Sequence, residues 1–113
     1  MNSFFTEENY RTFFNNAPDA IIVVDADTKK ILDVNPAASN MYGYTGEEML
    51  KKNITDISAE PEKTITAINR GVNYIPLRYH RKKDGTIFPV EITISFINKD
   101  SRQIHMSFVR DIT

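Results

Sequence analysis

Apolar and polar side chains alternate along the last third of the chain, which is the period of a strand with one buried face. In the clearest stretch, Ile92 and Ile94 stand between polar neighbours. We expect these isoleucines to face the core, and Glu91 and Thr93 to face outward. An Asp-Gly pair at 84–85 is a strong hairpin-turn signal between two such stretches. The alternation therefore predicts three strands, over residues 74–82, 87–98 and 102–111.

Two short segments rich in β-branched residues predict a hairpin near the start of the chain, over residues 20–25 and 30–34. A helix is expected before them, with Thr6 as its N-cap and an end near Asn15. This helix has an aromatic face that needs cover, either from the domain itself or from a partner chain. The face consists of Tyr10, Phe13 and Phe14.

Three helix-boundary signals follow one another in the stretch NPAASNMYGYTGEEML. Asn35 can cap a helix that begins at Pro36, where the missing N–H of proline costs nothing. Gly43 suits the left-handed position after that helix. Thr45 opens a second helix, with Glu48 at capping-box spacing. The middle of the chain is therefore predicted to hold several short helices.

The predicted elements follow the order helix, two strands, several short helices and three strands. Strands in runs with helices between them favour an α+β fold with an antiparallel sheet. The apolar face of this sheet needs a cover, and the short helices of residues 36–71 are the candidates. The longest of them spans about 60–70. Because a cover broken into short helices can curl over the sheet, it can also enclose a hollow.

Composition and charge narrow the class of protein. The 113 residues have the size of one domain, and 14 basic against 15 acidic residues give a net charge of -1. This balance gives no reason to expect a nucleic-acid partner or direct membrane contact. The chain contains no cysteine, which excludes disulfides and cysteine metal sites. We therefore expect a cytoplasmic location.

The residue types needed for catalysis do not form a recognisable pattern. His80 and His105 are the only histidines, and we expect both to be solvated on strands. Neither stands at metal-ligand spacing from another ligand. A glycine-rich phosphate loop is also missing from the sequence. We predict no catalytic residue and no metal site.

The predicted hollow has two interpretations. Its side chains could simply fill it as close-packed core, or they could surround a small ligand. The residues expected to line it, from the alternation in the strands and the helical spacing in the cover, are Ile54, Ile57, Ile65, Ile68, Leu77, Tyr79, Ile92, Ile94, Met106 and Phe108.

Four segments of the chain together resemble a known family. They are DAIIVVD at 19–25, ILDVNPAASNMYGYTGEEML at 31–50, HRKKDGTIFPVEITIS at 80–95 and SFVRDIT at 107–113. In this order and spacing they resemble a PAS domain, across nearly the whole chain. The resemblance implies a five-stranded antiparallel sheet in the order 2-1-5-4-3, covered on one face by short helices. We expect an N-terminal flanking helix at 1–16 and the PAS domain at 17–113.

The resemblance also implies a function. PAS domains are sensory or dimerisation modules of larger signalling proteins, often histidine kinases. The chain ends where the family's domain ends, so we expect a sensor or signal-transmission domain excised from such a protein. The alternative is a ligandless dimerisation or interaction module of a diguanylate cyclase or a transcription regulator.

Cofactor binding can be judged against the subfamilies of PAS domains. Flavin photosensors of the family use a cysteine, and redox-type members often place a tryptophan near the flavin; this chain has neither. Haem-binding members commonly use a histidine on the long helix, and EPEKTITAINRG has none, although Met41 or Met49 could ligate iron. We therefore expect no flavin and no haem, and at most a weakly bound small molecule.

Partner contacts and signal coupling are expected at the two ends of the domain. We expect a homodimer through the N-terminal helix and the outer sheet face, to which Thr93, Ser95, Ile97 and Val109 are assigned. A downstream output domain is expected in the parent chain. Asp111 stands at the family position for coupling to it, and either Asp111 or Thr113 can cap a following helix.

Overall fold

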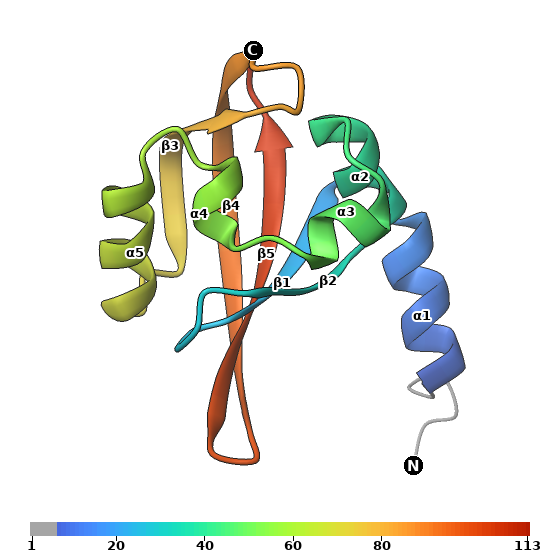
Figure 1. Ribbon diagram of the computed structural model, residues 1–113. Coiled ribbons are helices and arrows are strands. Elements are labelled where there is room, and N and C mark those ends of the chain that lie inside the picture. The colour runs from blue at the N-terminus through green and yellow to red at the C-terminus, as the bar shows by residue number, and fades with distance from the viewer. Residues whose placement is uncertain (1–6) are drawn as a thin grey trace.

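The computed structural model describes residues 7–113, in which strands and helices follow the predicted order (Figure 1). Five strands form one sheet in the order β2-β1-β5-β4-β3, and all neighbours are antiparallel. This confirms the α+β fold and the strand order that the family resemblance implied. The strands are β1 (Ala20–Asp25), β2 (Ile31–Val34), β3 (Tyr74–Arg81), β4 (Ile87–Lys99) and β5 (Arg102–Asp111).

Four short helices cover one face of the sheet, and a fifth, near the N-terminus, lies outside this cover but next to the first of the four (Figure 1). The predicted flanking helix is present up to Asn16, whereas its proposed N-cap Thr6 lies outside the described residues. The helices are α1 (Glu7–Asn16), α2 (Pro36–Tyr42), α3 (Gly46–Leu50), α4 (Ile54–Ile57) and α5 (Pro61–Asn69).

Asn35 is the N-cap of α2, as predicted, and it also joins three elements. Its Oδ1 accepts from the N–H of Ala38 at 3.0 Å and from the N–H of Ile21 in β1 at 2.8 Å. Its Nδ2 donates to the carbonyl oxygen of Phe14 in α1 at 3.1 Å. Asn35 is fully buried, so one side chain fixes where α1, β1 and α2 meet.

The other predicted helix boundaries are also present. Gly43 ends α2 with a φ of 79°, a left-handed conformation that glycine adopts at little cost. Thr45 and Glu48 form the capping box at the start of α3. These closely spaced boundaries divide the cover into short helices that wrap around the sheet face.

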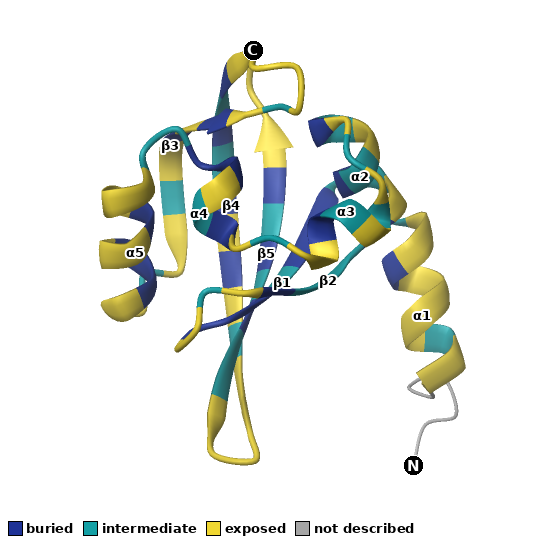
Figure 2. Ribbon diagram, viewed as in Figure 1, coloured by how far each residue is buried: buried dark blue, intermediate teal, exposed yellow. Residues whose placement is uncertain are grey.

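The register of β4 agrees with its alternation. Val90, Ile92 and Ile94 are buried between the sheet and the helices, whereas Thr93 is exposed and Glu91 is half-buried. Figure 2 shows that the buried residues of α4 and α5 lie on the sides facing the sheet. β4 therefore sets which face of every neighbouring strand points inward.

A bulge in β3 reverses the predicted faces of that strand. Ile75 pairs with Ile92 but Arg78 pairs with Val90, so β3 has one residue more than β4 in this interval. The bulge includes Pro76, which has no N–H for the ladder. Beyond it, Arg78 and His80 point inward. The prediction that Leu77 and Tyr79 line the hollow was therefore wrong.

The faces of β5 are also opposite to the prediction. Residues directly opposite each other in an antiparallel pair share a face. Ile92 pairs with Val109 and Ile94 pairs with Ser107, so the inward face of β5 carries Val109, Ser107 and His105. Val109 was expected on the outer face, but it lies on the inner face. Met106 and Phe108 point outward instead, beside Val23 and Ile21 of β1.

The outward side chains of β1 and β5 meet α1. Phe14 is only 2% exposed, and a shallow apolar hollow lies between it and Ile21, Met106 and Phe108. The flanking helix therefore packs on the outer sheet face, although against other residues than those assigned from the sequence. Phe13 and Tyr10 remain 66% and 44% exposed, which leaves part of the aromatic face of α1 uncovered.

Candidate ligand cavity

An interior cavity lies between the sheet and the helices α4 and α5. Its volume is about 30 Å³, space for one or two water molecules. Its wall is mainly apolar and includes a few polar side chains. The apolar residues are Val24, Ile54, Ala67, Ile68, Ile75, Ile92, Ile94 and Val109, and the polar ones are Thr64, Arg78, His80, His105 and Ser107.

The residues predicted to line a hollow divide into three groups. Ile54, Ile68, Ile92 and Ile94 do line the cavity. Ile57 is fully buried in the core but does not belong to the cavity wall. The remaining five point elsewhere, and they are Ile65, Leu77, Tyr79, Met106 and Phe108.

Each of those five has a physical reason for its position. The β3 bulge turns Leu77 and Tyr79 outward, and the pairing of β5 with β4 turns Met106 and Phe108 outward. On α5 the side facing the sheet carries Thr64 and Ala67. Ile65 follows Thr64 by one residue, about 100° around the helix, and is exposed.

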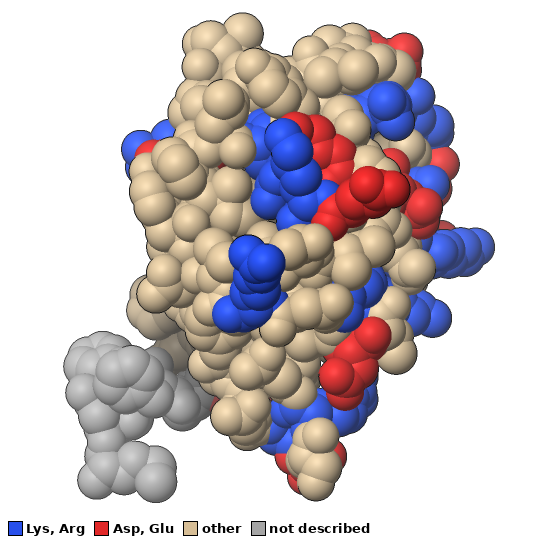
Figure 3. Space-filling view, turned by 90° about the vertical axis from the view of Figure 1, so that its left-hand side faces the viewer, with Lys and Arg blue, Asp and Glu red and all other residues tan. Residues whose placement is uncertain are grey.

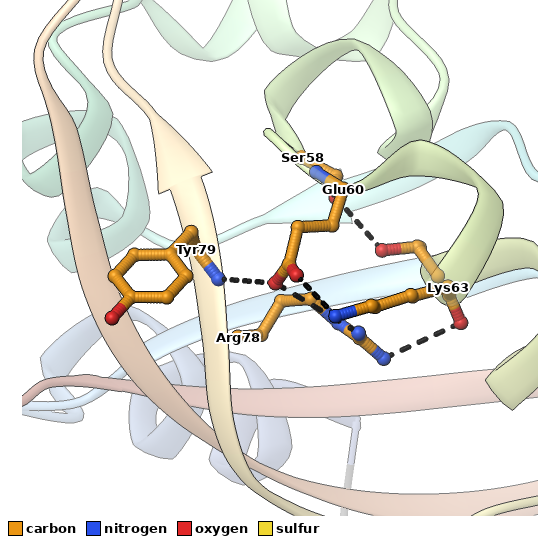
Figure 4. A network of polar contacts seen from close by, with 6 residues as sticks. Ser58, Glu60, Lys63, Arg78 and Tyr79 are labelled. Carbon is orange, nitrogen blue, oxygen red and sulfur yellow. Dashed lines mark hydrogen bonds and ion pairs between the residues drawn. The ribbon is translucent and has the colours of Figure 1, made fainter.

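Arg78 is the charged residue of the cavity wall, and it is only 7% exposed. Its Nη2 donates to the carbonyl oxygen of Lys63 in α5 at 3.3 Å, and its Nη1 lies 4.0 Å from Oε1 of Glu60 (Figure 4). Its buried Nε has no hydrogen-bond partner among residues 7–113. The two terminal nitrogens of the guanidinium thus have partners, whereas Nε has none within residues 7–113.

Glu60 divides its carboxylate among several donors. Oε2 accepts from Nζ of Lys63 at 2.8 Å, and Oε1 accepts from the backbone N–H of Tyr79 at 3.0 Å (Figure 4). The Lys63 hydrogen bond and then that of Tyr79 hold the pKa of the Glu60 carboxyl below its ordinary value. Because Glu60 serves these partners too, it compensates the charge of Arg78 only in part.

His80 is buried, contrary to the expectation that both histidines are solvated. The β3 bulge turns it inward, where its Nδ1 lies 2.6 Å from the hydroxyl of Tyr42. Burial, assisted by the positive charge of Arg78, lowers the pKa of His80 to about 4. His80 is therefore neutral near pH 7 and belongs to the core.

His105 is also buried, with only 1% of its surface exposed. Its Nε2 lies 3.0 Å from Oε1 of Gln103, and its ring meets Phe96 edge-on at a centroid distance of 4.6 Å. Burial and then the charge of Lys29 lower the pKa of His105 below its ordinary value. Its Nδ1 has no hydrogen-bond partner within the described chain.

The two unpartnered atoms, Arg78 Nε and His105 Nδ1, lie toward different parts of the cavity wall. Arg78 pairs with Val90 and His105 pairs with Phe96, so six residues of β4 separate their positions along the sheet. An unsatisfied buried polar atom costs about 1–3 kcal/mol. A polar guest that reaches either atom would therefore be stabilised, whether it is a water molecule or a ligand group.

These polar wall residues were missed in the sequence because they alternate with apolar residues along the strands. The apolar residues were expected to face inward, and the polar ones between them were therefore expected to face outward. In β3 the apolar residues Ile75, Leu77 and Tyr79 suggested the buried face. Pro76 was the available signal, since a proline inside a strand often marks a bulge and therefore a change of face.

A surface groove of about 570 Å³ lies between α5 and β3, outside the cavity. Ala67, Ile75 and Arg78 line both the groove and the cavity, so they form the wall between them. Lys63, Arg70 and Glu62 stand on the groove side. Figure 3 shows this side of the molecule, where basic and acidic side chains intermingle next to a broad uncharged area.

The carboxyl end of β5 carries the residues predicted to couple the domain to an output element. Oδ1 of Asp111 accepts from the backbone N–H of Thr113 at 2.9 Å and also from its hydroxyl group. The hydrogen bond from the Thr113 side chain is the main cause that holds the pKa of Asp111 below its ordinary value. Asp111 thus forms a local turn at the end of the sheet.

Residues 7–113 contain neither a cluster of metal-ligand side chains nor a membrane-spanning helix. In that part of the chain no three or more His, Asp or Glu side chains are grouped so that they could hold a metal ion. None of its helices is long and apolar enough to cross a membrane.

Two sensor proteins are similar to this chain over nearly its whole length. The methyl sulfide methyltransferase-associated sensor of Methanosarcina acetivorans is 26% identical, across 96% of this chain and 11% of that protein. Sensor protein FixL of Bradyrhizobium diazoefficiens is 26% identical, across 95% of this chain and 23% of that protein. The chain thus spans less than a quarter of the length of either relative.

A solved structure and a family model identify the domain. The crystal structure of a PAS domain from a two-component sensor histidine kinase is 28% identical, with a TM-score of 0.82, over 92% of this chain and 94% of that chain. The family model of the PAS domain matches residues 18–113. With its sheet order, its cover of short helices and this match, the chain belongs to the PAS domain family.

Proposed function

We propose that this chain is the cytoplasmic, non-catalytic sensory domain of a sensor histidine kinase. Two relatives are sensors by name, and a similar structure comes from a two-component sensor histidine kinase. The observation that carries the proposal is the interior cavity, where apolar walls surround a few polar groups that are incompletely partnered. This combination is typical of a site that recognises a small molecule.

The ligand we propose is small and weakly bound, and is neither flavin nor haem. The chain has no cysteine and no tryptophan, and α5 carries no histidine. A cavity of about 30 Å³ holds far less than the ring system of either cofactor. The domain therefore needs a ligand of few atoms, or must open before it binds a larger one.

Native mass spectrometry of the purified 113-residue chain tests ligand binding directly, since it detects a bound molecule and the oligomeric state together. A cavity-filling variant of the parent protein tests the signalling role. Ile94→Phe adds volume to the cavity wall, whereas the control Ile97→Phe changes an exposed residue of the same strand. We expect the first variant alone to remove the stimulus dependence of autophosphorylation. Equal responses of both variants would contradict a sensory cavity.

The exposed aromatic side chains of α1 support the proposed contact with a second copy. Phe13 and Tyr10 are 66% and 44% exposed, whereas Phe14 of the same helix is buried against the sheet. A homodimer through α1 and the outer sheet face would cover them. Sedimentation of the chain at increasing concentration measures this association.

The same observation supports the second candidate function, a ligandless dimerisation module of a diguanylate cyclase or a transcription regulator. In that case the cavity holds only water, and dimerisation alone carries the signal. A parent protein that keeps its response in Ile94→Phe but loses it in Phe13→Ser would favour this candidate over the ligand sensor.

A further inference from the structure

Arg78 occupies an unusual position between the interior and the surface. It lines the cavity and the α5–β3 groove at once, and it is more than nine-tenths buried. Figure 4 shows its guanidinium directed toward the backbone of Lys63 in α5. Arg78 is therefore the charged residue of the wall that separates the groove from the cavity, which it forms with Ala67 and Ile75.

The charge of Arg78 is not fully compensated by its neighbours. Glu60 lies 4.0 Å away and is shared with Lys63 and the Tyr79 N–H, while Nε lacks a partner within residues 7–113. A buried cation with a free donor favours an anion, because charge-assisted hydrogen bonds are the strong ones in a dry site. Arg78 can thus bind a carboxylate that reaches the cavity.

The rest of the cavity defines what such a carboxylate carries. Most of the wall consists of aliphatic side chains, including Ile68, Ile92 and Ile94, and the nearby hydroxyl groups are few. Apolar walls favour an alkyl group over a second polar group. We propose that this cavity binds a short-chain aliphatic monocarboxylate, with its carboxylate on Arg78 and its alkyl chain among the isoleucines. This inference rests on the proposed ligand-sensing function.

Binding requires a movement of α5, because about 30 Å³ is less than the volume of propionate. Several hydrogen bonds join β3 to the start of α5: Arg78 donates to the Lys63 carbonyl oxygen at 3.3 Å, the Tyr79 N–H donates to Oε1 of Glu60 at 3.0 Å, and the Tyr79 carbonyl oxygen accepts from the N–H of Ala59 at 2.8 Å. A carboxylate can replace the carbonyl oxygen as the acceptor of Arg78. The ligand would thereby remove one of the hydrogen bonds between α5 and β3 as it binds, and so loosen the start of α5.

Titration with matched anionic and neutral probes tests the ligand class. Acetate, propionate and butyrate are compared with acetamide, propionamide and butyramide at constant ionic strength, and isoleucine methyl shifts are followed by NMR in the 113-residue chain. We expect saturable shifts at Ile68 and Ile92 with propionate, and at least tenfold weaker binding of propionamide. Equal affinity for both probes, or no shift with any carboxylate, would overturn the carboxylate proposal.

Variants locate the binding group. Arg78→Gln should weaken propionate binding at least tenfold, whereas Arg70→Gln, which changes a cation of the outer groove only, should alter it less than threefold. If Arg78→Gln does not fold, Ala67→Leu narrows the shared wall and should abolish the shifts. Loss of binding in Arg70→Gln alone would place the anion in the groove and overturn the proposal.

The proposed sensory function is judged by separate results. A neutral molecule found in the cavity by native mass spectrometry would refute the carboxylate class but keep the sensor. Full stimulus dependence in the parent protein with Ile94→Phe would refute the sensory cavity itself, whatever the carboxylate titration shows.

Discussion

The hydroxyl of Tyr42 lies 2.6 Å from Nδ1 of His80, and this contact joins α2 to β3 inside the core. Burial raises the pKa of the Tyr42 hydroxyl and lowers that of the His80 imidazole, so both groups are uncharged near pH 7. The hydroxyl can then donate to Nδ1. A buried polar pair thus links α2 to β3.

Removing the hydroxyl should destabilise the domain. In Tyr42→Phe, His80 Nδ1 stays buried without its partner, at a cost of about 1–3 kcal/mol. Urea unfolding at pH 7.5 measures the change. Tyr10→Phe is the matched control, because Tyr10 is largely exposed, and it should change stability by less than about 0.5 kcal/mol. Equal stability of the two variants would contradict a structural role for the pair.

The pKa of His80 predicts loss of stability in mild acid. The unfolded chain binds a proton on His80 near pH 6.5, whereas the folded domain does so only near pH 4. Between these values the unfolded state holds more protons, so stability falls as the pH falls. From pH 7.5 to pH 5 the loss attributable to His80 should be about 2 kcal/mol.

Unfolding of wild type and His80→Gln across this range isolates the contribution of His80. The variant should show a shallower decrease of stability with falling pH than the wild type. His105 also has a lowered pKa and adds a slope of the same sign, but it is present in both proteins. Parallel pH profiles would show that His80 is not the cause.

The fold was predictable because short local sequence patterns determine where its strands and helices begin and end. Asn35, Gly43 and the Thr45–Glu48 pair mark helix ends through their own backbone chemistry, and the structure has each of them. The strands of the structure differ from the predicted ones by at most one residue at either end. Local patterning and capping thus define the elements well.

The cavity wall was less predictable because the facing of β3 and β5 depends on distant pairing. Ile75 faces inward, but the bulge at Pro76 makes Arg78 its inward successor instead of Leu77. On β5 the register against β4 selects Ser107, although Met106 and Phe108 are more apolar. Phe14 of α1 lies near Met106 and Phe108 on the outer face and shields them in part. When a sheet carries apolar residues on both faces, the alternation in the sequence does not show which residues of a strand point inward.

Two adjacent aromatic residues of α1 should respond differently to truncation. Phe14→Ala removes a side chain packed between α1 and the sheet, and should cost about 3 kcal/mol of stability. Phe13→Ala removes an exposed ring, so monomer stability should hardly change while dimerisation weakens. Thermal melts and analytical sedimentation separate these effects. A Phe13→Ala chain that sediments like wild type at all concentrations would exclude α1 as the dimer contact.

The purified domain should be colourless. Haem and oxidised flavin both absorb visible light, and we propose that neither occupies the cavity. The measurement is an absorption spectrum taken after gel filtration, with the denatured protein extracted to release any tightly held pigment. A visible band that elutes with the protein and disappears on extraction would overturn this part of the proposal.

Asp111 is the residue that we propose as the joint between the sheet and an output domain. Its carboxylate accepts two hydrogen bonds from Thr113, so it fixes the direction in which the chain leaves β5. Asp111 is exposed at the end of the sheet, and loss of a cap-like contact of this kind costs about 1 kcal/mol. Asp111→Ala should therefore leave the fold of the domain nearly unchanged.

Signal output of the parent protein should be far more sensitive to Asp111→Ala than the fold. A fixed turn passes a small displacement of β5 into the following element, whereas a frayed turn absorbs it. The measurements are autophosphorylation of the parent protein with and without stimulus, and thermal melts of the domain. The control variant is Asp27→Ala, which removes an exposed carboxylate in the β1–β2 turn. We expect Asp111→Ala alone to lose the difference between the two states. A full stimulus response in this variant would show that the coupling runs through another part of the domain.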